Sequence, residues 1–538
     1  MKRAELLESL SRHGVYDLAV VGGGATGLGV ALDAALRGFS VVLLESHDFA
    51  GGTSSRSTKL LHGGVRYLAQ GNLALVREAL AERATVLRIA PHLAQPLPFV
   101  MPSYRWWQTP FYGLGLKLYD LLAGGAGLGR TEFLNRAQAL QALPGVKPDG
   151  LRGGVKYWDG QFDDARLALA LARSAEAAGA RVLNYAEVTA VRQLAGADQP
   201  MSVLDVTDRR GGGSSPLQAR CVVNATGVWV DALRDRTQPP VNQGGTPSHM
   251  VSPSQGVHVV VDRDFLPGGH ALLVPKTRDG RVLFAVPWLG KLVLGTTDTP
   301  RRDLPREPDA FAEELEFILS EASQALSRPV RRADIRSLWV GLRPLVAAPE
   351  AAEGGTKVLS REHTIVVDAN GLVTVTGGKW TTYRAMAEDV LERCFASRLL
   401  PHRAGGQSAG HVLLGAGATA SPVTPLYAPP GLHLYGTEAP QVGACPGQAN
   451  LLGAGLTEAM VRYAARFEYA QTVEDVLARR WRVLFLDAAE AARLAPAVAA
   501  ILAEELSGDP ELAAFQALCA RYLPVSASPV DAPAASMP

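Results

Sequence analysis

The stretch from Tyr16 to Glu45 constrains the fold more than any other part of this chain. A short apolar run leads into three glycines with the spacing G-x-G-x-x-G, namely Gly22, Gly24 and Gly27. An Ala- and Leu-rich helical pattern follows, stops at Gly38, and gives way to a second apolar run that ends in Glu45. Strand, turn, helix, strand and acid in this order predict a βαβ dinucleotide-binding unit.

Each part of this pattern has a physical role. Glycines in the turn let backbone N–H groups approach a pyrophosphate, which then lies at the positive end of the following helix. An acid about 20 residues further on, here Glu45, binds ribose hydroxyls. A lone G-x-G-x-x-G would be a weak signal, because glycine-rich turns often only join elements. The pattern predicts a dinucleotide without saying which one.

Composition places the chain among soluble globular proteins, with 47% hydrophobic and 20% charged residues. Its 538 residues are too many for one simple core, so we expect two or three domains. A net charge of +1 argues against a general attraction to nucleic acid. The cysteines lie far apart and fit reduced thiols in a cytosolic protein better than disulfides or a metal site. They are Cys221, Cys394, Cys445 and Cys519.

The N-terminal residues 1–15 read as a short charged helix. Glu5 and Glu8 interrupt the apolar core that a signal peptide needs, so no secretion signal is expected. The chain also lacks an uncharged apolar run of about 18 residues, and no spanning helix is predicted.

Periodicity indicates the organisation of the rest of the chain. Residues 72–90 have helical spacing up to Pro91, and apolar runs between 257 and 297 predict an antiparallel sheet. Residues 396–455 are rich in Gly, Ala and Pro and read as a linker or a loosely folded region. Residues 456–523 regain helical patterning and predict an all-helical domain, and 524–538 read as a disordered tail.

Residues 100–130 concentrate aromatic and leucine side chains around Lys117 and Asp120. Those charges argue against a membrane span, but the segment could lie on a membrane or line an interface. The plainer interpretation is an internal packed helix.

Three further motifs follow the βαβ unit in order. They are T-S-S-x-S-x-K-L-x-H-G-G-x-R-Y from Thr53, N-A-T-G-x-W from Asn224, and G-G-K-x-T-T-Y-R from Gly377. In combination they resemble the FAD-dependent glycerol-3-phosphate dehydrogenase family over about residues 16–395. The run TVEDVLARRWRVLFLD resembles the C-terminal domain of that family. Leu28 departs from the pattern, where a small residue is more usual.

The resemblance implies FAD rather than NAD, held by an α/β Rossmann-like FAD-binding domain that is interleaved with an antiparallel-sheet substrate domain. The FAD-binding parts are then about 16–70, 150–240 and 365–395, and the substrate parts about 71–149 and 241–364. A serine-rich loop is usually a solvated turn, but this one directly follows the acid, which favours a cofactor role. The residues expected to contact FAD are Gly22, Gly24, Gly27, Glu45, Thr53, Ser54, Ser55, Ser57, Lys59, His62, Val188, Thr226, Gly227, Gly378, Lys379, Thr381 and Thr382.

The same resemblance implies a substrate site. Planar guanidinium groups suit phosphate, and the matching positions are Arg66, Tyr67, Arg343 and Arg361. A neutral imidazole can accept the proton of the C2 alcohol while hydride passes to the flavin. His258 matches the active-site histidine of the family and His62 is the second candidate, while Lys379 would stabilise developing negative charge. The family usually has a basic residue and then Gly shortly before this histidine, whereas this chain has Gln255 and then Gly256.

We therefore expect oxidation of sn-glycerol 3-phosphate to dihydroxyacetone phosphate, with a membrane quinone as acceptor and no metal. The resemblance implies a cytoplasmic protein that is peripheral on the inner face of the cytoplasmic membrane. Three alternatives stay open: an oxidase that uses O2, a flavoprotein that oxidises an amino acid such as glycine or sarcosine, and a flavin-binding protein without activity. The sequence does not set the oligomeric state, and a homodimer also stays open.

Overall fold

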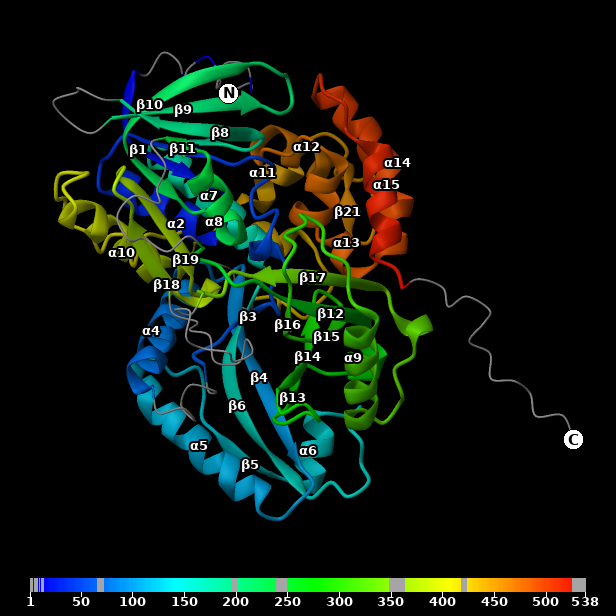
Figure 1. Ribbon diagram of the computed structural model, residues 1–538. Coiled ribbons are helices and arrows are strands. Elements are labelled where there is room, and N and C mark those ends of the chain that lie inside the picture. The colour runs from blue at the N-terminus through cyan, green and yellow to red at the C-terminus, as the bar shows by residue number, and fades with distance from the viewer. Residues whose placement is uncertain are drawn as a thin grey trace, which may run out of the picture.

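The computed structural model describes most of the chain (Figure 1). The described residues are Arg3, Glu8, Leu10, 14–64, 72–194, 201–238, 249–347, 363–417 and 423–524. The charged helix expected at 1–15 and the tail expected at 524–538 therefore lie almost wholly outside them, as do Arg66, Tyr67 and Arg361.

The first sheet is built around the predicted βαβ unit. Its strands are β1 (Val15–Val21), β2 (Val41–Leu44), β7 (Arg181–Leu183), β8 (Ala186–Gln193), β9 (Ser202–Asp208), β10 (Ser214–Asn224), β11 (Thr237–Gln238), β18 (His363–Val367) and β19 (Leu372–Gly377). Strand β1 lies between β2 and β10, which both run parallel to it, and β19 extends the parallel set beyond β10. Helices α2 (Ala25–Leu36), α7 (Asp164–Ala177) and α10 (Tyr383–Ala396) share one buried core with these strands.

Local chemistry fixes both ends of α2. Gly22 has φ +113°, and a methyl group there would lie 2.5 Å from the Ala225 carbonyl oxygen, so only glycine fits this turn. At the other end Gly38 has φ +81° and its N–H donates to Ala35 O at 2.8 Å. The predicted helix stop at Gly38 is confirmed.

The second sheet contains the antiparallel strands predicted between 257 and 297. Its strands are β3 (Leu60–Leu61), β4 (Ala94–Ser103), β5 (Glu132–Asn135), β6 (Gly153–Phe162), β12 (Ser254–Asp262), β13 (Ala271–Val274), β14 (Leu283–Trp288), β15 (Lys291–Gly295), β16 (Thr299–Pro300) and β17 (Ser337–Arg343). Within it, β12 pairs antiparallel with both β15 and β17, although β13 pairs parallel with β4. The helices around it are α4 (Leu73–Ile89), α5 (Gln108–Ala123), α6 (Arg136–Ala142) and α9 (Ala312–Ala325), whereas α8 (Val230–Asp235) packs against the first sheet.

Helix α5 is a surface helix rather than the internal one of the plainer interpretation. Leu116 and Tyr119 are buried on its inner face, whereas Phe111, Leu114 and Leu121 are 66%, 73% and 76% exposed. The helix forms an outer edge of the molecule, at the lower left of Figure 1. No helix in the described ranges is both long enough and apolar enough to cross a membrane.

The predicted helical domain is confirmed at the C-terminal end. It contains α12 (Glu458–Phe467), α13 (Val483–Leu486), α14 (Ala488–Glu505) and α15 (Leu512–Arg521), with a π-helical turn at Asp475–Arg480.

The region expected to be a linker, 396–455, is folded where it is described. It contains α11 (Ala439–Gly443) and β20 (Leu451–Gly453), which pairs with β21 (Leu456–Thr457). Its Leu434, Tyr435 and Val442 are buried in the core of the helical domain. The sequence did not indicate that this region is folded, because its buried side chains are spaced without the regular period of a helix or a strand.

Candidate active site

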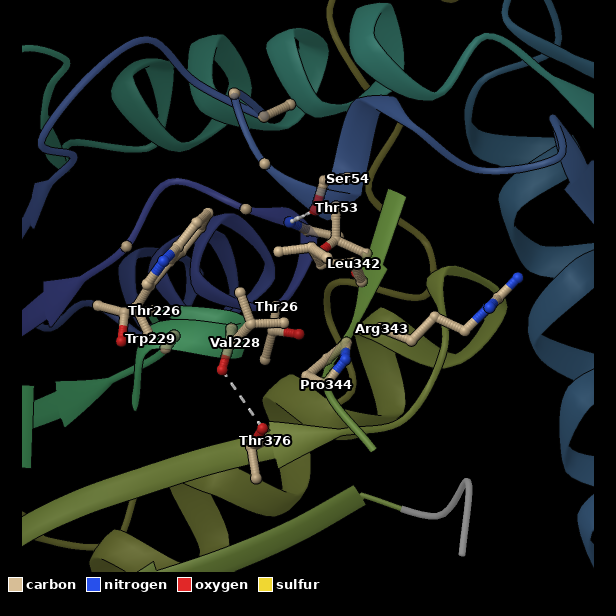
Figure 2. A pocket seen from close by; sticks show the side chains of 18 of the residues that line it. Thr26, Thr53, Ser54, Thr226, Val228, Trp229, Leu342, Arg343, Pro344 and Thr376 are labelled. Carbon is tan, nitrogen blue, oxygen red and sulfur yellow. Dashed lines mark hydrogen bonds between the residues drawn. The ribbon is translucent and has the colours of Figure 1, made fainter. Parts of the chain in front are cut away.

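A cavity of about 600 Å³ lies where the two sheets meet. Its walls come from the glycine turn after β1, the loop after β2, the turn after β10, the inner strands β12 and β17, and the turn after β19. Figure 2 shows part of this wall, with Trp229 and Arg343 on opposite sides of Thr53 and Leu342. Segments more than 300 residues apart in sequence therefore form one site.

One part of the cavity is a cradle for a dinucleotide. The Glu45 carboxylate lines it and accepts from the backbone N–H groups of Gly23 at 2.7 Å and His47 at 2.9 Å. Burial raises the pKa of Glu45, and the hydrogen bond from Gly23 offsets part of that rise. Gly27 keeps the turn closed, because a methyl group there would lie 2.0 Å from the Gly22 carbonyl oxygen.

The serine-rich loop joins the walls of the cavity to one another. The Ser54 hydroxyl accepts from Ala25 N at 3.0 Å and so caps helix α2, while Ser54 O accepts from the Trp380 indole at 2.8 Å. The Thr53 hydroxyl donates to Leu342 O at 2.7 Å, next to the end of β17 (Figure 2). The loop is thus bonded to helix α2, to the turn after β19 and to strand β17 of the second sheet.

His258 faces the cavity from the middle of β12. Residues two apart on a strand share a face, so Gly256 lies on the same side, while Val257 and Val259 pack in a separate core with α9. The His258 ring stacks on Trp339 with 5.2 Å between ring centres, and its Nε2 lies 2.9 Å from the Thr58 hydroxyl. Burial, with the charges of Lys59 and Arg343, holds the pKa of His258 well below 6.5.

Arg343 lies across the same strand face. A methyl group at Gly256 would be 2.0 Å from Arg343 Nη2, so the glycine leaves room for the guanidinium. That nitrogen donates to Thr297 O at 2.8 Å, and Arg343 Nη1 lies 3.2 Å from Asp298 Oδ1. Glycine at position 256 thereby brings the guanidinium beside the histidine strand.

The departure at Gln255 lies on the other face of β12. Its side chain donates to Glu314 Oε2 on α9 at 2.5 Å and accepts from Arg301. It therefore bears on the packing of α9 and not on the cavity.

Most residues predicted to form the site line this one cavity. They are Gly22, Gly24, Glu45, Thr53, Ser54, Ser57, His62, Val188, Thr226, Gly227, His258, Arg343, Gly378, Lys379 and Thr381. Four others lie behind its wall, namely Gly27, Ser55, Lys59 and Thr382. The structure places Lys59 in the interior, where its ammonium group pairs with Asp164 at 2.7 Å and donates to Ser55 O. Arg66, Tyr67 and Arg361 are outside the described residues.

Sequence reasoning missed a second set of lining residues. Leu304 and Arg306 line the cavity from the segment between β16 and α9, and the Trp229 indole donates to Leu304 O at 3.1 Å. Trp229 ends the N-A-T-G-x-W motif, and this motif was the only sequence signal that pointed toward the Leu304 segment. Arg306 lies in a Pro- and Arg-rich stretch that carries no motif of its own.

Comparison with known proteins now supplies the family. A family model described as "FAD dependent oxidoreductase" matches residues 17–392, and one described as "C-terminal domain of alpha-glycerophosphate oxidase" matches 405–512. The mitochondrial glycerol-3-phosphate dehydrogenases of Macaca fascicularis and Arabidopsis thaliana are both 39% identical, over 94% and 92% of this chain and 73% and 83% of theirs. The chain belongs to the FAD-dependent glycerol-3-phosphate dehydrogenase family.

A solved structure agrees with this family. The glycerol-3-phosphate dehydrogenase of Bacillus halodurans in complex with FAD is 29% identical, with a TM-score of 0.75, over 97% of this chain and 98% of that one. The L-α-glycerophosphate oxidase of Mycoplasma pneumoniae is 16% identical with a TM-score of 0.55, which shows a shared fold only. The second family match begins at residue 405, so most of the expected linker belongs to the C-terminal domain.

FAD is the cofactor that this family binds, and the described residues fit it. The turn leaves no space for side chains at Gly22 and Gly27, and its Gly22 and Gly24 line the cavity, where a pyrophosphate would lie. Glu45 is held by backbone N–H groups at the edge of the cavity, where ribose hydroxyls can reach it.

Proposed function

We propose that this protein oxidises sn-glycerol 3-phosphate to dihydroxyacetone phosphate and passes the electrons to a membrane quinone. The observation that carries this proposal is the placement of His258 and the Arg343 guanidinium over one face of β12, inside the cavity that also contains the dinucleotide cradle. A base and a phosphate-binding cation thus lie beside the cofactor site.

His258 is the proposed base. A pKa well below 6.5 keeps the imidazole neutral near pH 7, so a ring nitrogen can accept the proton of the C2 hydroxyl. The Thr58 hydroxyl fixes the orientation of the ring through Nε2. The stacked Trp339 ring excludes water from one face of the imidazole.

Arg343 is the proposed anchor of the substrate oxygens, because its planar guanidinium can form paired hydrogen bonds. Its side chain is only 24% exposed and is already held by Thr297 O, so it is preorganised for an anion. Arg66, Tyr67 and Arg361 complete the proposed substrate site by resemblance to the family. Bound FAD would supply the hydride acceptor, and Lys379 on the cavity wall is proposed to stabilise negative charge beside it. His62, which also lines the cavity, is the second candidate for the base.

The quinone acceptor requires contact with a membrane, and the outer face of α5 is the proposed contact. Phe111, Leu114 and Leu121 of this helix, and Trp106 just before it, are all more than 60% exposed. The two charged residues of the helix contact neighbouring segments of the protein. Lys117 Nζ lies 4.9 Å from the centre of the Phe133 ring, and Asp120 accepts from Thr131 N at 2.7 Å. An apolar face of this kind suits an interfacial helix. By resemblance to the family, the proposed location is the inner face of the cytoplasmic membrane.

Anaerobic addition of sn-glycerol 3-phosphate to the holoenzyme tests the proposal directly. Loss of the oxidised flavin absorbance is expected, and glycine or sarcosine should leave the absorbance unchanged. The reverse pattern would identify an amino-acid oxidase, and no bleaching by any of the three would indicate flavin binding without this activity.

The reduced enzyme then reports on the acceptor. Mixing with a soluble quinone analogue should reoxidise the flavin much faster than mixing with O2. Rapid reoxidation by O2 with stoichiometric peroxide would instead identify a glycerol-3-phosphate oxidase.

A further inference from the structure

The loop from Asp48 to Lys59 is held from behind by the C-terminal domain. Its front side carries Thr53, Ser54 and Ser57, which line the cavity. On its far side the Ser55 carbonyl oxygen accepts from Arg482 Nη2 at 2.7 Å, across 427 residues of chain.

Arg482 belongs to a buried cluster of charges. Its guanidinium also donates to Asp164 Oδ1 at 3.2 Å, and the Arg482 and Asp164 side chains are both fully buried. Asp164 in turn accepts from the Ser57 hydroxyl at 2.7 Å and from Lys59 Nζ at 2.7 Å. The cluster therefore contacts the loop at three consecutive odd positions, 55, 57 and 59.

Two further arginines, Arg479 and Arg480, hold the start of the loop. Arg480 binds both carboxylate oxygens of Asp48, one of them at 2.9 Å, and Arg479 also donates to Asp48. Burial alone would raise the pKa of Asp48, but Arg480 and Arg479 outweigh it and bring that pKa down to about 2. Asp48 is thus a fully buried anion with two buried cationic partners.

Such clusters contribute little to net stability, because removing charges from water offsets most of their attraction. They do specify geometry, since each charge tolerates few arrangements of its partners. Neither Asp48 nor the three arginines line the cavity. Their contacts set the shape of a loop that does.

We propose that Arg479, Arg480 and Arg482 are positioning residues for the flavin. They hold the loop 48–59 in the conformation that presents its cavity side to the cofactor and caps α2 through Ser54. The C-terminal domain thereby acts on cofactor binding without touching the cofactor.

The test compares FAD affinity in two variants that break contacts between the same parts of the molecule. Arg482→Gln removes the charge behind the loop. Arg173→Gln is the matched control, because Arg173 of α7 forms a two-pronged pair with Glu438 at 2.6 Å, away from the loop. Each apoprotein is titrated with FAD and followed by flavin fluorescence.

We expect Arg482→Gln to raise the dissociation constant for FAD at least tenfold and Arg173→Gln to change it less than about threefold, where tenfold is 1.4 kcal/mol. Arg482→Lys should recover part of the affinity, because lysine keeps the positive charge behind the loop but lacks the planar fork of the guanidinium. Hydrogen exchange of residues 48–59 should be faster in the Arg482→Gln apoprotein than in the wild-type apoprotein.

Equal dissociation constants for Arg482→Gln and Arg173→Gln, or unchanged exchange in the loop, would overturn the proposal. If Arg482→Gln does not fold, Arg480→Lys decides, because it keeps the charge and loses the two-pronged bond to Asp48. A folded Arg480→Lys apoprotein with FAD affinity within threefold of wild type would also overturn it.

Discussion

At the scale of single residues, the site depends on two residues that share one face of β12, Gly256 and His258. Gly256 has no side chain, and His258 has no charge near neutral pH, because burial and two nearby cations lower its pKa. Sequence motifs predicted His258 and Arg343 as site residues. They did not predict that Gly256 makes room for the guanidinium, because this depends on the register of β12 against β17.

His258→Asn should lower the rate of flavin reduction by sn-glycerol 3-phosphate about 10²–10⁴-fold, the usual contribution of a general base. FAD absorbance of the purified variant should equal that of wild type. Anaerobic stopped-flow mixing measures the rate, and a rate close to wild type would assign the base to another group, with His62 the next candidate.

The pH dependence of kcat/KM follows from the same histidine. The base is lost when the imidazole is protonated, which happens as the pH falls through the pKa of the free enzyme. Since that pKa lies well below 6.5, activity should persist as the pH falls past 6.5. A profile between about pH 5 and about pH 8 checks this, and an acid limb centred at 6.5 or above would contradict it.

Gly256→Ala should displace the Arg343 guanidinium, because the new methyl group would lie 2.0 Å from Nη2. Weakening one charge-assisted contact costs about 1.5–3 kcal/mol, so KM for the substrate should rise at least tenfold while bound FAD is unchanged. Gly443→Ala is the control, since no atom lies within 4 Å of the added methyl group. Equal KM values for the two variants would remove Arg343 from the substrate site.

At the scale of elements, the βαβ unit was predictable because its signals are local. Glycine spacing, helical period and the terminal acid all lie between Tyr16 and Glu45. These signals predict the two strands and the helix that the structure contains there, β1, α2 and β2. The loop after Glu45 was only partly predictable, because most of its residues line the cavity while a few, at no regular spacing, bond to the interior. Ser54 and Ser57 line the cavity, whereas Ser55 and Lys59 bond to segments that no local pattern indicates.

Gly27→Ala should abolish FAD retention although Gly27 does not line the cavity. The new methyl group would meet a backbone oxygen at 2.0 Å, which a rotamer change cannot relieve. Arg343→Met should have the opposite effect, with FAD retained and turnover lost. Flavin-to-protein absorbance ratios and steady-state rates separate the two, and an exchange of these phenotypes would reverse the roles assigned to the two ends of the cavity.

At the scale of the whole molecule, contacts distant in sequence decide what the motifs cannot. Packing between domains determines where Leu304, Arg306 and the described part of 396–455 lie. No periodic pattern in the sequence indicated these positions. The exposed face of α5 is likewise set by the rest of the fold. Its sequence fits an internal helix as well as a surface one until the neighbours are known.

Leu114→Asp with Leu121→Asp should weaken binding to anionic lipid vesicles at least tenfold, because both side chains are more than 70% exposed on the α5 face. Leu451→Asp is the control, a leucine 65% exposed on β20 in the C-terminal domain. Co-sedimentation measures the bound fraction. Equal loss in both proteins would show that α5 is not the membrane contact.

The bond between Arg482 and Ser55 also sets an order of events during synthesis. The two residues are 427 positions apart, and chains grow at about 5–20 residues per second, so the loop exists for about 20–85 s before its partner does. If Arg482 shapes the loop, the nascent chain cannot bind flavin tightly during that interval. Cofactor capture would then be a late event that follows synthesis of the C-terminal domain, although the glycine fingerprint is made well before that domain.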